Sequence, residues 1–365
     1  MNGIVRRLHA TGIMYLAAVA LWTCTVTAAQ EAVFPGKNWD FKKPDELGLD
    51  GEKLDQFVAR IGGVGCIVKD GYMVKMWGNQ KSKADWASAM KPVMSTMVLF
   101  AVKEGKLKSV DARVRPYVQK VFKGKDLIPK DRSMTFRHLA NMTSGYALPE
   151  EPGAAWGYND YAINLYSRTL FEGVFEQKPN DAATESTRLG ALQFQDGSIF
   201  GSRGGHGLST TPRDFARIGW FWLNKGTWNG KQLLPRKYFE DFMKPGVPRA
   251  LPKTKGGRND YLGAYFTGGG TDQTPYGPGI YGFNWWFNAK VGISNKLTWP
   301  DAPPDTFQAN GHWRREVMTV IPSLKLVVAA RGNWGNFQPG DATAQSNQIL
   351  KLLRDASTVE APKKR

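Results

Sequence analysis

The chain has 365 residues, of which 42% are hydrophobic. This composition excludes a largely disordered protein and allows one large domain, or two that share a core. The formal net charge of +17 at pH 7 favours anionic surroundings, such as an anionic cell-envelope surface or an acidic substrate. The basic residues are scattered and form no nucleic-acid-binding motif, so we expect no nucleic-acid partner. The sequence does not indicate an oligomeric state.

Residues 1–29 have the pattern of an export signal. The basic pair Arg6 and Arg7 precedes an apolar stretch over 12–22, and small residues suited to cleavage follow over 25–29. We therefore expect a cleaved signal peptide and a periplasmic or secreted protein. An uncleaved membrane anchor is the alternative reading of the same segment.

The sequence offers no evidence for a cofactor or a metal. Cleavage of the signal would remove Cys24, and the remaining Cys66 lies in an apolar run that is expected in the core. There is no H-E-x-x-H motif and no cysteine pair, so a metal site is not expected. Residues 277–282 satisfy G-x-G-x-x-G, but no helical pattern follows them, which argues against a dinucleotide site.

The first elements after the signal are a hairpin and a helix. Two β-rich runs surround Asp70-Gly71 within residues 63–79, which predicts a β-hairpin. Residues 85–107 then carry apolar side chains at helical spacing, with Gly105 as a plausible C-terminal stop. This segment is predicted to be a buried helix.

The middle of the chain is predicted to be mainly helical. Helical patterns occupy residues 134–145, 158–175 and 211–226. Thr211 is the expected N-cap of the last of these, since proline at the first helical position commonly follows such a cap. Residues 249–263 are rich in Gly, Pro and Lys and are expected to form a loop.

Strand patterns return near the C-terminus. Aromatic and β-branched runs at 279–290, 315–322 and 324–333 predict strands, and 341–357 reads as an amphipathic helix. Two β-rich ends around a helical middle predict a mixed α+β fold, with an antiparallel sheet built from both chain ends, flanked by helices and carrying a mainly helical insertion.

We expect one catalytic domain over residues 30–358. Residues 30–105 and 276–358 would form its α/β part, residues 106–275 its helical part, and residues 359–365 a polar tail.

A serine and a lysine lie one turn apart in the predicted buried helix. Ser88 and Lys91 are spaced i and i+3, so they share a face. A lysine beside an apolar stripe either extends to water or has its pKa lowered by burial. A desolvated lysine next to a hydroxyl is suited to activating a nucleophile. The alternative is a capping serine and a surface lysine.

Two further motifs follow Ser88 in order. Tyr158-Asn-Asp160 comes about seventy residues later, and a Gly311-His312 pair precedes an apolar strand pattern. With this context the sequence resembles the serine hydrolases of the β-lactamase and penicillin-binding-protein superfamily. It looks like the branch that includes class C β-lactamases, D-Ala-D-Ala carboxypeptidases, esterases and 6-aminohexanoate-dimer hydrolases. The segments "MTFRHLANMTSGY" and "GGHGLSTTPRDFARIG" are similar to segments of that family.

The resemblance implies a β-lactamase/transpeptidase-like fold and a set of catalytic residues. It implies that Ser88 is the nucleophile, that Lys91 and Tyr158 move the proton, and that His312 supports the site. The second oxyanion donor is expected to be a backbone N–H near Arg314 or Arg315.

The sequence departs from the family pattern at two places. Asp160 stands where the family carries asparagine, and an ionised carboxylate only accepts hydrogen bonds, which weakens the case for β-lactam recognition. The glycines usual after the histidine are replaced by Trp313 and Arg314. We expect Asp160, Trp313 and Arg315 to contribute to substrate binding. Asp160 could instead be a helix N-cap.

The sequence therefore predicts an exported serine hydrolase that cleaves a small carboxylic ester, amide or peptide through an acyl-enzyme. β-Lactamase or D-Ala-D-Ala carboxypeptidase activity is an alternative, as is a catalytically weak relative that binds cell-wall peptide. His138 and His206 are expected to be structural.

Overall fold

The computed structural model describes residues 32–266, 270–271, 274–291 and 295–357. The predicted signal peptide at 1–29 and the predicted tail at 359–365 lie outside these ranges. None of the helices in the described ranges is long and apolar enough to cross a bilayer.

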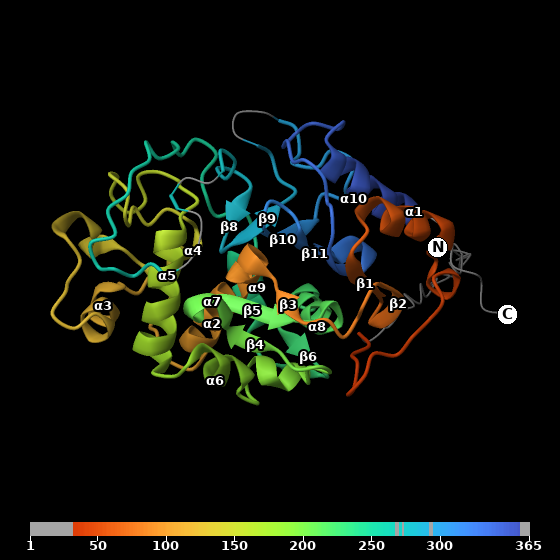
Figure 1. Cartoon of the computed structure of the whole chain (residues 1–365), viewed down its shortest axis with the longest axis horizontal. Coiled ribbons are helices and arrows are strands. Elements are labelled where there is room, and N and C mark those ends of the chain that lie inside the picture. The colour runs from red at the N-terminus through yellow and green to blue at the C-terminus, as the bar shows by residue number, and fades with distance from the viewer. Residues whose placement is uncertain (1–31, 267–269, 272–273, 292–294, 358–365) are drawn as a thin grey trace, which may run out of the picture. The chain divides into compact units, whose positions relative to one another are not determined.

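A seven-stranded sheet forms the centre of the described part of the chain (Figure 1). Its strand order is β2-β1-β12-β11-β10-β9-β8, and each pair of neighbours is antiparallel. The strands are β1 (Val64–Lys69), β2 (Tyr72–Trp77), β8 (Tyr281–Gly282), β9 (Trp285–Phe287), β10 (Phe307–Gly311), β11 (Glu316–Ile321) and β12 (Leu326–Arg331). Since β1 pairs with β12, the two ends of the chain meet in one sheet, which confirms the predicted fold class.

The predicted hairpin joins β1 to β2. Both turn residues have positive φ, 52° at Asp70 and 88° at Gly71. Asp and Gly tolerate this conformation at low cost, and it matches the twist of the flanking strands. The local sequence signal was therefore sufficient to predict this element.

Helices cover both faces of the sheet (Figure 1). On one face, α8 (Pro212–Leu223) packs against β1, β11 and β12, and its N-cap is Thr211 as predicted. On the other face, α1 (Gly51–Ile61) lies beside α10 (Gln345–Ala356). The sequence analysis predicted that α10 starts four residues before its observed first residue, and it did not predict α1.

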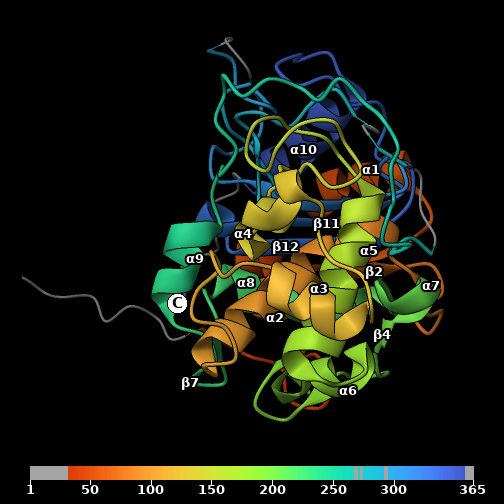
Figure 2. The same ribbon diagram turned by 90° about the vertical axis from the view of Figure 1, so that its left-hand side faces the viewer.

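The middle of the chain is mainly helical, as predicted, and Figure 2 views the molecule from its side. No helix or strand forms over 249–263, which confirms the predicted loop. Besides α8, the helical elements from residue 87 to residue 242 are η2 (Ala87–Met90), α2 (Lys91–Lys103), α3 (Arg115–Val121), η3 (Pro129–Ser133), α4 (Phe136–Ala140), α5 (Asp160–Arg168), η4 (Thr169–Phe175), α6 (Pro179–Thr184), η5 (Leu189–Leu192), α7 (Ser202–Gly205) and α9 (Arg236–Phe242). Short strands accompany them: β3 (Ala84–Asp85), β4 (Ile199–Gly201), β5 (Gly207–Thr210), β6 (Thr227–Trp228) and β7 (Lys231–Gln232).

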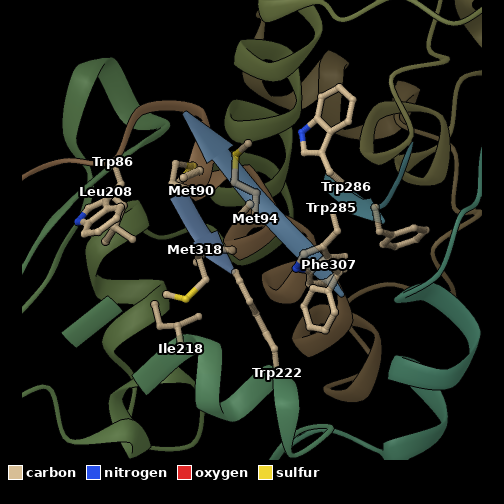
Figure 3. Close-up of a cluster of buried hydrophobic side chains, with 14 of the residues drawn as sticks. Trp86, Met90, Met94, Leu208, Ile218, Trp222, Trp285, Trp286, Phe307 and Met318 are labelled. Carbon is tan, nitrogen blue, oxygen red and sulfur yellow. The ribbon is translucent and has the colours of Figure 1, made fainter. Parts of the chain in front are cut away.

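Helix α2 is the central element of the core. We predicted an apolar stripe, but all residues from Lys91 to Ala101 are buried, so the helix is enclosed on every side. Met90 and Met94 lie among side chains of the sheet and of α8 (Figure 3). Trp222 of α8 donates a hydrogen bond from Nε1 to Thr96 Oγ1 at 3.0 Å. This packing fixes the turn that precedes α2.

Cys66 is a buried free cysteine in strand β1. Burial raises the pKa of its thiol. A neutral, inaccessible thiol is unreactive, which agrees with the predicted role as a core residue.

Candidate active site

Ser88 lies in a tight turn between the sheet and helix α2. The turn is the short 3₁₀ helix η2, and it runs directly into α2 at Lys91. Ala87, just before the serine, has a φ of 47°, an uncommon conformation for a residue with a Cβ. Backbone strain of this kind is concentrated at functional sites. The predicted helix start is therefore present, but as a 3₁₀ turn.

Strand β10 holds this turn from the other side. An ideal Cβ on Gly311 would lie 2.5 Å from the carbonyl oxygen of Trp86 and 3.2 Å from the backbone nitrogen of Ala89. Only a residue without a side chain permits this approach. The Ser88 turn and the end of β10 are thus in direct contact.

The side chain of Lys91 connects the predicted catalytic residues. Its Nζ lies 2.6 Å from Ser88 Oγ, 3.0 Å from Tyr158 Oη and 2.8 Å from Asp160 Oδ1. The residue is 3% exposed, so the alternative of a surface lysine is excluded. An ammonium group has three donors, and here each has one acceptor.

The environment of Lys91 favours its charged form. Burial works to lower the pKa of the amine, but the charge and hydrogen bonds of Asp160 and Tyr158 outweigh burial, and the pKa is raised. The ion pair with Asp160 is itself buried, with side-chain exposures of 4% and 10%. Lys91 is therefore a cation in the resting site.

Asn159 and Asp160, at the start of α5, have different roles: one caps the helix and the other pairs with Lys91. Asn159 is the N-cap of α5, because its side chain accepts a hydrogen bond from the backbone N–H of Ala162. Asp160 is therefore not the cap, and its carboxylate pairs with Lys91. Tyr158 is held by aromatic packing against Trp286, with ring centroids 6.1 Å apart.

These residues line one cavity of about 720 Å³. Its walls come from the Ser88 turn, α5, α7, the end of β10 and the loop after β12. They are formed by Ala87, Ser88, Lys91, Tyr158, Asp160, Arg203, His206, Gly207, Thr274, Pro275, Tyr276, Trp286, Asn310, Gly311, His312, Trp313, Arg314, Gly335, Asn336 and Phe337.

His312 lies in the wall of this cavity but is engaged with other residues. Its Nε2 is 3.1 Å from Arg203 Nη1, and its Nδ1 is 2.9 Å from Glu316 Oε2. Because a guanidinium only donates, Nε2 acts as the acceptor, and Nδ1 donates to Glu316. Burial raises the pKa of Glu316, partly opposed by His312. His312 thus shapes the rim in this structure.

The turn after His312 differs in detail from the sequence expectation. His312, Trp313 and Arg314 all have positive φ, at 30°, 54° and 72°. Trp313 is 81% exposed at the cavity, and Arg314 lies buried in its wall. Among the described residues, Arg315 is not part of that wall.

Two backbone N–H groups of this turn already donate hydrogen bonds within the turn. Arg314 N–H donates to Gly311 O at 2.7 Å, and Arg315 N–H is within 3.1 Å of the same oxygen. In this geometry neither group is directed to an oxyanion. The second oxyanion donor stays a prediction.

The sequence analysis did not predict that the side chains of His206 and Arg314 line the cavity. His206, expected to be structural, lines the cavity, and its Nδ1 is buried without a hydrogen-bond partner in the described structure. Burial, with a smaller contribution from the Lys91 cation, lowers the pKa of His206 to about 4, so it is neutral near pH 7. His206 stands within the family-like segment "GGHGLSTT", which was the available signal.

The described residues contain no cluster of three or more His, Cys, Asp or Glu side chains that could hold a metal ion.

Comparison with known proteins supports this reading of the fold. Residues 52–187, which contain Ser88, Lys91 and Tyr158, match the Beta-lactamase family model. Among curated proteins, none matches the sequence.

Three solved structures share the fold at low identity. A beta-lactamase from Mycobacterium bovis has a TM-score of 0.57 and 16% identity, covering 84% of this chain and 100% of that one. EstCE1, described as a hydrolase with promiscuous acyltransferase activity, has a TM-score of 0.56 and 13% identity, covering 84% and 99%. A beta-lactamase/D-alanine carboxypeptidase from Yersinia pestis has a TM-score of 0.51 and 15% identity, covering 84% and 97%.

The family-model match over residues 52–187 and the shared fold both support the resemblance to serine hydrolases of the β-lactamase and penicillin-binding-protein-like superfamily. The resemblance seen in the sequence is confirmed at this level.

The contact between Gly311 and the Ser88 turn leads to a testable prediction. In Gly311→Ala the new methyl group must push β10 away from Trp86, and we expect about 1–3 kcal/mol lower stability. Displacement of Ser88 should also lower kcat/KM by roughly 10²-fold. Urea unfolding and ester hydrolysis measure the two effects.

Gly332→Ala is the matched control, since its Cβ would lie 2.5 Å from the carbonyl oxygen of Ile61, outside the cavity wall. It should lose similar stability with little change in kcat/KM. Equal activity losses in the two variants would contradict the role assigned to Gly311.

Proposed function

We propose that the protein is an exported serine hydrolase that cleaves carboxylic esters or linear amides through an acyl-enzyme on Ser88. The observation that carries the proposal is the position of Lys91 Nζ, within 3.0 Å of Ser88 Oγ, Tyr158 Oη and Asp160 Oδ1. A hydroxyl held by a buried lysine that also contacts a tyrosine has a route along which it can lose its proton and act as a nucleophile. The tight 3₁₀ turn presents this hydroxyl to the cavity.

The proposed reaction has two half-reactions. Ser88 Oγ attacks the carbonyl carbon, its proton passes to the Lys91–Tyr158 pair, and the same pair then protonates the departing alkoxide or amine. Water attacks the resulting acyl-serine, the pair accepts a proton from water, and that proton returns to Ser88 Oγ as the carboxylic acid leaves. Proton transfer by such groups contributes typically about 10²- to 10⁴-fold in rate.

Lys91 and Tyr158 have different parts in the relay. As a cation, Lys91 has no lone pair to accept a proton, so it can only pass one on while it receives another. The ammonium donates to Tyr158 Oη, and a cation at this distance stabilises negative charge that develops on the phenol oxygen. Tyr158 in its phenolate form is therefore the proposed proton acceptor. It takes a proton from the Lys91 ammonium while Lys91 takes the proton of Ser88 Oγ, which leaves a neutral phenol and an unchanged ammonium.

Asp160 argues for esters and linear amides before β-lactams. A carboxylate committed to Lys91 cannot donate a hydrogen bond to a substrate amide carbonyl, as an asparagine could. A panel of short-chain esters, linear amides, D-Ala-D-Ala peptides and a chromogenic cephalosporin ranks these activities. Binding of cell-wall peptide without turnover would favour the non-catalytic alternative.

Covalent labelling tests the nucleophile. A fluorophosphonate probe should label Ser88, because its hydroxyl is activated and faces the cavity, and Ser88→Ala should abolish both labelling and hydrolysis. Mass spectrometry of the digested adduct locates the site. An adduct on a different serine, or hydrolysis that persists in Ser88→Ala, would refute the assignment.

The raised pKa of Lys91 predicts a change in pH dependence. Activity that needs the Lys91 cation is kept below its pKa and lost as pH rises through it, so the wild-type rate should not fall on the alkaline side near pH 9. In Asp160→Asn the carboxylate is gone and burial still lowers the pKa, so a descending alkaline limb should move into the accessible range.

The measurement is kcat/KM for a neutral ester between pH 6 and about pH 10, with thermal melting as the fold check. His206, which also faces Lys91, has a pKa of about 4 and does not titrate there. A folded Asp160→Asn enzyme with an unchanged profile would show that the Lys91 charge does not govern the rate.

Export rests on the sequence pattern of residues 1–29. We expect N-terminal sequencing of the protein from its native host to give a start near residue 30 and cell fractionation to find it outside the cytoplasm. Retention of Met1 together with recovery only in the cytosol would remove the export proposal without affecting the proposed chemistry.

A further inference from the structure

Arg314 is a buried cation that has no counter-ion among the described residues. It is 8% exposed and forms part of the wall of the cavity that contains Ser88. Within the described ranges, no carboxylate pairs with its guanidinium and no acceptor takes a hydrogen bond from it. Burial of a charged group in this way is unfavourable unless something else compensates it.

Two other buried arginines among the described residues have acceptors for most of their N–H groups, although Arg217 Nε has none. Arg188 is 6% exposed and donates to both carboxylate oxygens of Glu104, at 2.6 and 2.7 Å. Arg217 is completely buried, and it donates to three backbone carbonyl oxygens and lies 3.7 Å from Asp214. Burial alone therefore does not explain the missing partners of Arg314.

Aromatic rings hold the Arg314 side chain in place. Its Cζ lies 3.6 Å from the ring centroid of Phe337 and 5.7 Å from that of Trp299. Such stacking stabilises the cation and fixes the plane of the guanidinium. The five N–H donors are not satisfied by a ring face and stay available to a ligand. Burial lowers the pKa of Arg314 to about 9, so the group is charged at neutral pH.

Asn310 supplies an independent observation in the same wall. Its side-chain amide nitrogen and oxygen are both buried, and neither has a hydrogen-bond partner in the described structure. Asn310 is the penultimate residue of β10, four positions before Arg314. Native proteins rarely leave both atoms of an amide unpaired, so this side chain also indicates a polar group that enters the cavity.

We propose that Arg314 and Asn310 form a subsite for a carboxylate of the substrate, so that the preferred substrates are esters or amides that carry a second, free carboxylate. This inference rests on the proposed function of the Ser88 site and adds the chemical class of its substrate. A planar carboxylate fits the fork of a guanidinium in a bidentate pair. The amide of Asn310 can donate to the same group.

The charge balance of the cavity agrees with an anionic ligand. Lys91 and Asp160 neutralise each other, and His206 is neutral. At the rim, Arg203 pairs with Asp85 at 2.8 Å. Arg314 thus remains a positive charge without a counter-ion among the described wall residues.

Matched substrates test the subsite. One series carries the carboxylate in the acyl chain, as in mono-p-nitrophenyl glutarate, with the corresponding carboxamide as its neutral partner. A second series carries it in the leaving group, as in the acetyl ester of 3-hydroxypropanoate and its carboxamide. The wild-type enzyme should prefer the carboxylate member in at least one series, by about tenfold or more in kcat/KM.

Variants then assign the preference to Arg314. Arg314→Met keeps an apolar side chain to pack on Phe337, and it should remove the preference by lowering kcat/KM for the carboxylate member at least about tenfold more than for its neutral partner. Arg315→Met changes a charge on the same turn outside the cavity wall, and it should leave the preference intact. Equal losses for charged and neutral substrates in Arg314→Met would indicate a structural role and overturn the proposal.

Two controls keep the outcomes separate. If Arg314→Met does not fold, inhibition of the wild-type enzyme is measured instead. Glutarate is compared with glutaramide at constant ionic strength, and equal inhibition by the two compounds overturns the subsite. Hydrolysis of neutral esters that Ser88→Ala abolishes confirms the proposed function independently. Such hydrolysis without any carboxylate preference in the wild type refutes the subsite alone.

Discussion

The buried ammonium of Lys91 imposes the strongest constraint on this fold. It begins a helix that is enclosed on all sides, where a charge without partners would be unfavourable. Its three acceptors come from the turn before α2, from the loop before α5 and from the first turn of α5. The helical middle of the chain must therefore dock against the element that carries Ser88 before this charge is satisfied. One requirement thus joins the stability of the core to the assembly of the site.

Asp160 changes the electrostatics of the site relative to the family pattern seen in the sequence. An asparagine here would leave Lys91 as an uncompensated cation next to the substrate. With aspartate, that cation is neutralised inside the protein, and the positive potential that a ligand meets comes from Arg314 at another part of the wall. If the proposed mechanism and subsite hold, the site separates the charge used for proton transfer, on Lys91, from the charge available for recognition, on Arg314.

Local signals explain what could be predicted from the sequence. The Asp70-Gly71 turn and the Thr211 cap depend on conformational preferences and hydrogen bonds within a few residues, and both are confirmed. Ser88, Lys91 and Tyr158 were identified through motif order, and the structure places Ser88 Oγ and Tyr158 Oη within hydrogen-bond distance of Lys91 Nζ.

Properties that depend on distant packing could not be predicted in the same way. Helix α1 has a partly charged sequence, and it is stabilised by its contact with α10 at the other end of the chain. The burial of Arg314 depends on Phe337 and Trp299, and no periodic pattern connects these positions. The sequence analysis therefore named Arg315 for substrate binding, whereas the structure places Arg314, and not Arg315, in the cavity wall.

At three positions of the β10–β11 turn, residues 312–314, the side chain proposed to meet the substrate is one that lowers the stability of the fold. Each left-handed residue with a side chain costs on the order of 1 kcal/mol relative to glycine, and His312, Trp313 and Arg314 all adopt this conformation. Glycine at these positions would relax the backbone and remove the groups that meet the ligand. Selection for heat resistance alone should therefore drive this turn toward glycine, and selection for a charged substrate should keep it strained.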